Sequence, residues 1–194
     1  MIIGLTGLYC AGKNYIASLL EKRGFLVLDV DKLGHTVIES KKQIITEYFG
    51  SEILKKDGTV DRKLLGKKVF GNKSMMEELE KIIHPEVNRI TNEWIAGHRH
   101  ENCVLNAAVL HKSDAFNQLN IIILVCAPFF TRLLRARKRD KLTWKALIRR
   151  FMSQKRFLAQ YSAKNADICK VKNSGIEKSN LDIQINSILS KLGL

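Results

Sequence analysis

Residues 2–14 read I-I-G-L-T-G-L-Y-C-A-G-K-N, an apolar run that leads directly into a glycine-bounded loop and a lysine. The apolar run predicts a short buried strand, and residues 13–22 predict the helix that follows the loop. Gly7, Gly12 and Lys13 match the fixed positions of the phosphate-loop pattern G-x-x-x-x-G-K-[ST]. Glycines allow the backbone to approach phosphate oxygens, and the helix N-terminus attracts the anion. The stretch therefore predicts a nucleotide phosphate site.

The loop also predicts which residues contact the nucleotide. We expect Lys13 to place its charge between the β- and γ-phosphates, which is a catalytic role. Asn14 replaces the hydroxyl residue that ligates Mg²⁺ in this pattern, although its carbonyl oxygen is also a ligand for hard cations. We interpret Cys10 as a small loop residue rather than a reactive thiol. The ATP-binding residues predicted here are Gly7, Cys10, Ala11, Gly12, Lys13, Asn14 and Tyr15.

The composition is that of a basic globular protein. The 194 residues include 33 Lys and Arg and 19 Asp and Glu, which gives a formal net charge of +14. Such an excess favours an anionic partner such as nucleic acid, a lipid surface or a phosphorylated small molecule, although a basic surface without a specific partner is also consistent. A nucleic-acid partner is not expected, because the sequence carries no recognisable RNA- or DNA-binding motif and no run of interleaved aromatic residues.

The chain carries no pattern typical of secretion or of a membrane span. The apolar start lacks a basic segment, and the longest apolar run, 121–130, is too short for a bilayer. The four cysteines form no C-x-x-C pair, so a local zinc or redox motif is not expected. These observations predict a cytoplasmic protein, and they leave its oligomeric state open, with a monomer favoured.

The rest of the chain alternates apolar segments with helical patterns, which is typical of an α/β fold. Strands are predicted at 25–30, 103–107 and 121–126, and a weaker one at 171–174. Residues 31–99 predict a helical insertion, 129–163 a second helical region rich in arginine, and 181–192 an amphipathic helix. Both prolines, Pro85 and Pro128, are expected at element boundaries.

A set of short motifs follows the phosphate loop in a specific order: D-V-D at 29–31, V-D-R at 60–62, I-I-H-P-E-V at 82–87, R-x-x-x-R-D at 135–140, Gln154, A-D at 166–167 and N-S-G at 173–175. In order and spacing they resemble the dephospho-CoA kinase family over essentially the whole chain. The resemblance implies transfer of the ATP γ-phosphoryl group to the ribose 3′-hydroxyl of dephospho-CoA, the last step of coenzyme A synthesis.

The resemblance also implies an architecture. It predicts a P-loop NTPase-type five-stranded parallel sheet with helices on both faces, a helical substrate-domain insertion and a mobile lid. The nucleotide-binding core would comprise residues 1–31, 100–128 and 164–194, the substrate (CoA) domain residues 32–99, and the lid residues 129–163.

Roles for residues outside the loop come from the same resemblance. Asp31 is expected to be the general base, to contact the substrate and to organise Mg²⁺ (or Mn²⁺), with Asp29 in support. Arg62 would grip a phosphate of dephospho-CoA, and His84 would either contact substrate or only close a helix. Arg135 and Arg139 match the lid arginines, Arg139 in a catalytic role and Arg135 on ATP. The remaining predictions place Asn173 and Gly175 at the adenine end of ATP, and Arg132, Arg137 and Lys138 on a solvated face.

The sequence departs from the family where acidic or hydroxyl residues are expected. The family reads D-x-P-L-L-F-E after its third core strand, whereas residues 106–112 read N-A-A-V-L-H-K, and His35 stands in place of an arginine. With Asn14 and Asn106, two candidate metal positions are amides. Besides an active enzyme, this pattern allows a slow or silent nucleotide-binding protein. Another P-loop small-molecule kinase is the third hypothesis, which the helical insertion disfavours.

Overall fold

The computed structural model describes residues 1–140, 142–154, 161, 167–175 and 178–194. Ala166 and parts of the predicted lid (141, 155–160 and 162–163) lie outside these residues. The chain divides into two compact units, a sheet unit of Met1–Leu28 and His98–Leu194 and a helical unit of Asp29–Gly97. Among the described helices we find none with an apolar stretch of bilayer-spanning length.

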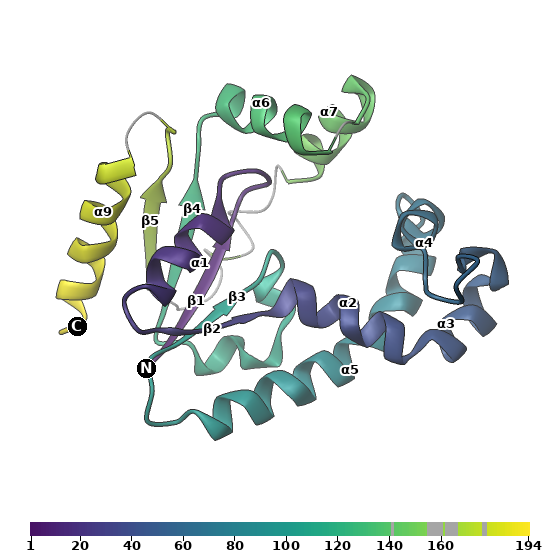
Figure 1. Ribbon diagram of the computed structural model, residues 1–194, viewed down its shortest axis with the longest axis horizontal. Coiled ribbons are helices and arrows are strands. Elements are labelled where there is room, and N and C mark those ends of the chain that lie inside the picture. The colour runs from purple at the N-terminus through teal and green to yellow at the C-terminus, as the bar shows by residue number, and fades with distance from the viewer. Residues whose placement is uncertain (141, 155–160, 162–166, 176–177) are drawn as a thin grey trace. The chain divides into compact units, whose positions relative to one another are not determined.

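The sheet unit is built on five strands in the order β2-β3-β1-β4-β5 (Figure 1). Parallel registers join β1 to β3 and β4, and β4 to β5, and the predicted parallel sheet is thereby confirmed. Its elements are β1 (Ile2–Gly7), α1 (Lys13–Glu21), β2 (Leu26–Asp29), β3 (Cys103–Asn106), η2 (Leu110–Lys112), η3 (Asp114–Gln118), β4 (Ile121–Cys126), α6 (Phe129–Asp140), α7 (Trp144–Ser153), β5 (Ile168–Lys172) and α9 (Lys178–Lys191).

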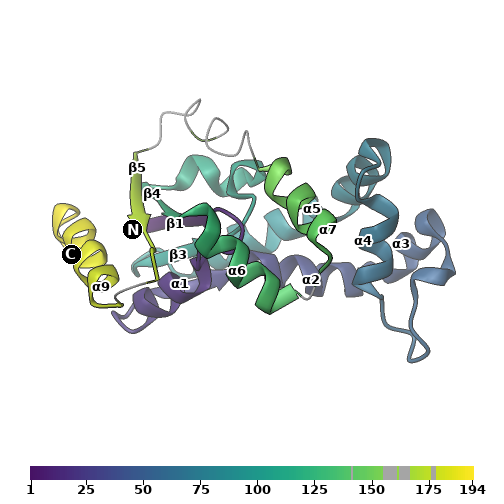
Figure 2. The ribbon, with the colours of Figure 1, turned by 90° about the horizontal axis from the view of Figure 1, so that it is seen from above.

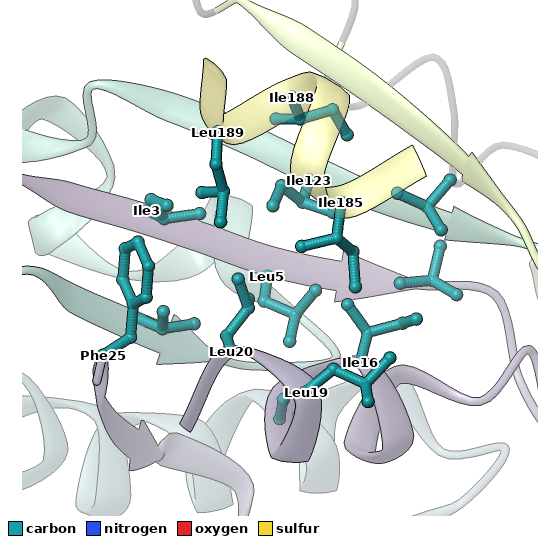
Figure 3. Packing of buried hydrophobic residues seen from close by; sticks show 14 of the residues in the cluster. Ile3, Leu5, Ile16, Leu19, Leu20, Phe25, Ile123, Ile185, Ile188 and Leu189 are labelled. Atoms are coloured by element: carbon teal, nitrogen blue, oxygen red, sulfur yellow. The ribbon is translucent and has the colours of Figure 1, made fainter. Parts of the chain in front are cut away.

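Alternation along β1 decides what covers each face of the sheet. Ile3 and Leu5 are fully buried and point toward α1 and α9, whose apolar side chains close that face (Figure 3). Gly4 faces the other way, where Leu110 and Leu119 lie so close that a Cβ at Gly4 would be 2.5 Å from Leu110. Each buried Leu or Ile contributes roughly 1.5–3 kcal/mol. This core holds the strand from whose end the phosphate loop leaves.

The helical unit contains α2 (Val30–Ser40), α3 (Lys42–Phe49), η1 (Ser51–Ile53), α4 (Arg62–Val69) and α5 (Lys73–Gly97). Aspartates start two of these helices. Asp29 caps α2 by accepting a 3.0 Å hydrogen bond from the Lys32 N–H, and Asp61 caps α4 in the same manner. The unit has its own apolar core, which includes Ile45, Phe49, Ile53, Leu65 and Val69.

Three sequence predictions are corrected. Pro85 lies inside α5 and not at its end. The proline removes only one helical hydrogen bond, and the buried face of the helix continues on both sides of it, with Leu79 before and Val87 after. The last strand is Ile168–Lys172 rather than 171–174, with Val171 buried between exposed lysines. Arg132 is not solvated: it is half-buried, donates to the Ala127 carbonyl at 3.1 Å and stacks on a phenylalanine ring.

Candidate active site

The backbone conformation at Gly12 determines the shape of the helix-side end of the phosphate loop, Gly12–Asn14. Gly12 caps α1 with a φ of 96°, a left-handed value that favours glycine. The Tyr15 and Ile16 N–H groups donate to the Gly12 carbonyl at 3.1 and 3.3 Å, so the helix starts sharply at Lys13. The first N–H groups of an α-helix have no acceptor within the helix and attract anions. The end thus has the geometry that phosphate binding requires.

A glycine is also needed where β1 enters the loop. A Cβ at Gly7 would lie 2.8 Å from the backbone oxygen of Val125 on the neighbouring strand β4. The next residue donates from its N–H to the same Val125 carbonyl at 3.2 Å. Only a residue without a side chain fits this approach, so the motif's first glycine serves strand packing as well as phosphate access.

Arg135 and Asn173 brace the loop from two distant parts of the sheet unit. The Ala11 carbonyl accepts hydrogen bonds from Arg135 Nη1 at 3.3 Å and from Asn173 Nδ2 at 2.8 Å. Arg135 Nη2 also donates to Asn173 Oδ1 at 3.1 Å. A Cβ at Gly12 would lie 2.3 Å from Asn173, and one at Gly175 would lie 2.6 Å from Arg135. Five predicted ATP-binding residues are therefore brought together.

The loop tip, Tyr9 and Cys10, packs against α6 and α7. The Tyr9 N–H donates to Gln154 Oε1 at 2.7 Å, and the Tyr9 hydroxyl donates to Asp140. Cys10 has a φ of 59° and is half-buried. Burial raises the pKa of the Cys10 thiol, which agrees with its interpretation as an unreactive loop residue.

Arg139, predicted to be catalytic, forms an ion pair with the next residue. Its Nε and Nη2 donate to the two oxygens of Asp140 at 2.7 and 3.1 Å. Arg150 Nη1 lies 3.4 Å from the same carboxylate. The hydrogen bond from Arg139 holds the pKa of Asp140 below its usual value, and Asp140 in turn raises the pKa of Arg139. A charged carboxylate therefore anchors the arginine.

An amide pair stands beside the start of α1. Asn106, at the end of β3, donates from Nδ2 to Asn14 Oδ1 at 3.3 Å. Asn106 is 2% exposed, and among the described residues its Oδ1 has no hydrogen-bond partner. The described residues contain no group of three or more His, Cys, Asp or Glu side chains placed to hold a metal. Any cation here would meet neutral amide oxygens from the sheet unit.

The remaining predicted residues belong to the helical unit. Asp31 lies in the first turn of α2, Arg62 begins α4 and His84 lies within α5. His35, which replaces the family's arginine, is a solvent-exposed residue of α2. Partial desolvation of the imidazole, followed by the charge of Arg62, lowers the pKa of His35, while Asp31 acts in the opposite direction. Asp31 and Arg62 are thus electrostatic neighbours of one imidazole.

Two contacts at the loop tip were missed by reasoning from sequence. The phosphate-loop pattern assigns no role to Tyr9, although a large aromatic side chain in a loop of otherwise small residues is a usable signal. In the sequence, Asp140 stands out only as the last residue of an arginine motif. Its partner lies 131 positions away in the chain, so no local pattern joins them.

Comparisons with known proteins agree with this geometry. A family model described as dephospho-CoA kinase matches residues 1–177. The dephospho-CoA kinase of Treponema pallidum is 32% identical over 203 residues, which cover 100% of this chain and 96% of that protein. A crystal structure of a Thermus thermophilus protein superposes with a TM-score of 0.81 at 28% identity, covering 99% of this chain and 97% of the other. A dephospho-CoA kinase structure from Campylobacter jejuni gives 0.64 at 24% identity over 97% and 96% of the two chains, a likeness of fold alone.

Proposed function

The chain belongs to the dephospho-CoA kinase family, and we propose that it transfers the γ-phosphoryl group of ATP to the ribose 3′-hydroxyl of dephospho-CoA, giving coenzyme A and ADP. The observation that carries this proposal is the phosphate loop itself. Gly12 holds a left-handed conformation directly before Lys13, at the start of a helix packed on a parallel sheet. Ligands bind to open α/β sheets at the carboxyl ends of their strands.

In the proposed reaction, the phosphate loop binds and orients the phosphates. The N–H groups at the start of α1 contact phosphate oxygens, and the Lys13 ammonium neutralises charge on the β- and γ-phosphates. The brace of Arg135 and Asn173 on the Ala11 carbonyl keeps the loop in this conformation before ATP arrives. Phosphoryl transfer depends mainly on such positioning, because the protein takes part in little covalent chemistry.

We assign the acceptor side to the helical unit. Asp31 takes the proton of the ribose 3′-hydroxyl as the oxygen forms its bond to the γ-phosphorus, and the bond to the β,γ-bridging oxygen breaks to release ADP. Arg62 would hold a phosphate of dephospho-CoA, because its planar guanidinium matches phosphate oxygens. His84 is a further substrate contact in this proposal. Coupling of Arg62 and Asp31 to His35 supports a common polar site on this unit.

Arg139 is proposed to stabilise the charge that develops on the transferring group. Its Nε and Nη2 face Asp140, and the planar guanidinium therefore directs Nη1 away from that carboxylate. This edge is the one that would contact phosphate. Asn173, which is part of the loop brace, and Gly175, which lies close to Arg135, are proposed to border the adenine end of ATP.

The sheet unit and the helical unit each carry oxygen donors suited to a divalent cation, although Asn106 lacks the negative charge of the aspartate in the family motif. We propose that Asn14 and Asp31 would hold Mg²⁺, since amide and carboxylate oxygens are both hard ligands. The Oδ1 of Asn106, which has no hydrogen-bond partner among the residues that the structure describes, would accept from a water molecule. When bound with ATP, the ion supplies charge neutralisation on the phosphates. We further propose a cytoplasmic monomer that does not act on nucleic acid.

The test is a phosphoryl-transfer assay with ATP and dephospho-CoA, run with Mg²⁺ and again with Mn²⁺. We expect coenzyme A and ADP in equal amounts, and a fall in turnover of about 10²–10⁴-fold for Asp31→Asn, because a general base contributes on that order. Asp57→Asn is the control: it removes the same charge from an exposed turn and keeps the oxygen that accepts from the Thr59 N–H.

The amide pair favours one competing function. The first turn of α1 itself carries no acidic residue, and Asn14 and Asn106 contribute neutral amides there, which would suit a protein that binds nucleotide without turnover. ATP binding by calorimetry, together with no coenzyme A in either metal, would support that alternative. Equal turnover by Asp31→Asn and wild type would overturn the assigned base while leaving the reaction intact.

A further inference from the structure

The tip of the phosphate loop is embedded in the cluster between α6 and α7. Ala136, Leu147 and Phe151 form the buried centre of this cluster, and Tyr9 and Cys10 pack against it. Figure 2 shows the two helices side by side. The Tyr9 ring meets Phe151 edge-on, with 5.4 Å between ring centroids. The loop tip therefore packs directly against the helical segment that carries Arg139.

Tyr9 is held at both its backbone and its hydroxyl. Its N–H donates to Gln154 just beyond α7 at 2.7 Å, and its hydroxyl donates to Asp140 at the end of α6. Arg150 Nη1 donates to the same hydroxyl at 3.3 Å. A single loop residue thus contacts both helices through polar atoms.

The carboxylate of Asp140 joins this residue to Arg139. Arg139 occupies both carboxylate oxygens, and Tyr9 donates to one of them. The Arg139 guanidinium also lies over the Tyr9 ring, 5.2 Å from its centroid, and that of Arg150 lies at 5.6 Å. Burial and the neighbouring Asp140 raise the pKa of Tyr9, so the phenol stays protonated and remains a donor.

We propose that Tyr9 is a positioning residue: through Asp140 it ties the phosphate loop to α6 and α7, and it thereby sets the position of Arg139 relative to the bound phosphates. The inference rests on the proposed function, in which Arg139 acts on the transferring group. Two hydrogen bonds to Asp140 restrict the orientation of the Arg139 guanidinium. The hydrogen bond from the Tyr9 hydroxyl holds the same carboxylate against the loop. Pre-orientation of this kind acts in the transition state more than in ATP binding.

Tyr9→Phe separates this role from simple packing. Phenylalanine keeps the ring against Phe151 and under the two guanidinium groups, and removes only the hydroxyl. We expect kcat to fall about three- to tenfold, with the KM for ATP changed less than about twofold, because an interaction of the transition state is lost. Tyr48→Phe is the matched control, since Tyr48 is 64% exposed in the helical unit, and its kcat should equal that of the wild type.

A double-mutant cycle tests the route through the carboxylate. In an Asp140→Ala background, which leaves no side-chain acceptor for the Tyr9 hydroxyl, Tyr9→Phe should cause no further loss of kcat. The same three- to tenfold loss in both backgrounds would overturn the proposal. So would a fall in kcat of less than twofold in the single variant, or a rise in KM alone.

A measurement on the resting protein separates this proposal from the proposed function. Hydrogen–deuterium exchange across residues 129–153 should be faster in Tyr9→Phe than in the wild type and in Tyr48→Phe. If the wild type does not phosphorylate dephospho-CoA, the proposed function fails, and exchange alone then decides the tether. Faster exchange supports it, and unchanged exchange overturns it.

Discussion

The two parts of the phosphate loop are held by different kinds of interaction. At the helix-side end, a left-handed glycine and the start of α1 determine the backbone conformation. Both features can be recognised in the sequence motif. At the loop tip, Tyr9 is fixed by side chains of α6, α7 and Gln154, far away in sequence. Phosphate binding is therefore encoded locally, whereas the connection of the loop to the arginine-bearing helices is encoded by distant partners.

The sharpest way to separate these parts is Lys13→Ala. The charge at the helix-side end disappears while the tip contacts remain, so we expect turnover to fall by about 10²–10³-fold or more with little change in melting temperature. Lys22→Ala, an exposed lysine at the other end of α1, should retain wild-type activity. Steady-state kinetics and thermal unfolding measure both effects. A large loss of stability in Lys13→Ala would show that the end is not independent of the tip.

A smaller effect is expected from Gly12→Ala, which strains the helix-side end alone. The free energy of unfolding should fall by about 2–4 kcal/mol, since a left-handed residue gains a Cβ that meets Asn173 at 2.3 Å. Gly24→Ala has a similar φ of 84° but open space around the new Cβ, and should lose only about 1–2 kcal/mol. Urea denaturation compares them. Equal losses would mean that the contact with Asn173 adds nothing.

The smallest effect concerns acid and the tip. The folded-state pKa of Asp140 is lowered, so its stabilising contribution is complete above the ordinary aspartate pKa of about 3.9 and is lost as pH falls through the folded value. The stability gap between wild type and Asp140→Asn should therefore narrow on acidification. Partial exposure of the pair limits the gap to about 1 kcal/mol. A stability difference between the two proteins that stays constant down to acid unfolding would contradict the lowered pKa of Asp140.

Reasoning from sequence predicted the parallel sheet and the strand–loop–helix unit well, because both follow from hydrophobic pattern and a motif with fixed glycines. It could not predict that Arg135 and Asn173 both donate to the Ala11 carbonyl. Every residue has a backbone carbonyl, so the sequence does not indicate which one a distant side chain will contact. Their roles toward ATP, like that of Arg139, stay predictions.

Two boundary errors have equally physical causes. Pro85 is tolerated inside α5 because the buried face of a 25-residue helix outweighs one missing hydrogen bond. The strand β5 was hard to place because the exposed Lys170 and Lys172 alternate along it with the buried Val171, which makes the strand look polar in sequence. In both cases the tertiary environment, rather than local preference, decided the boundary.

The order of the sheet also has a consequence for how the chain folds. β2 and β3 are neighbours, yet the entire helical unit separates them in sequence. Closing so long a connection from a disordered chain carries a large entropy penalty, and non-local strand pairing of this kind slows folding. Prior folding of the helices shortens the effective connection. Assembly of this edge of the sheet is therefore favoured late, after the insertion has formed its own core.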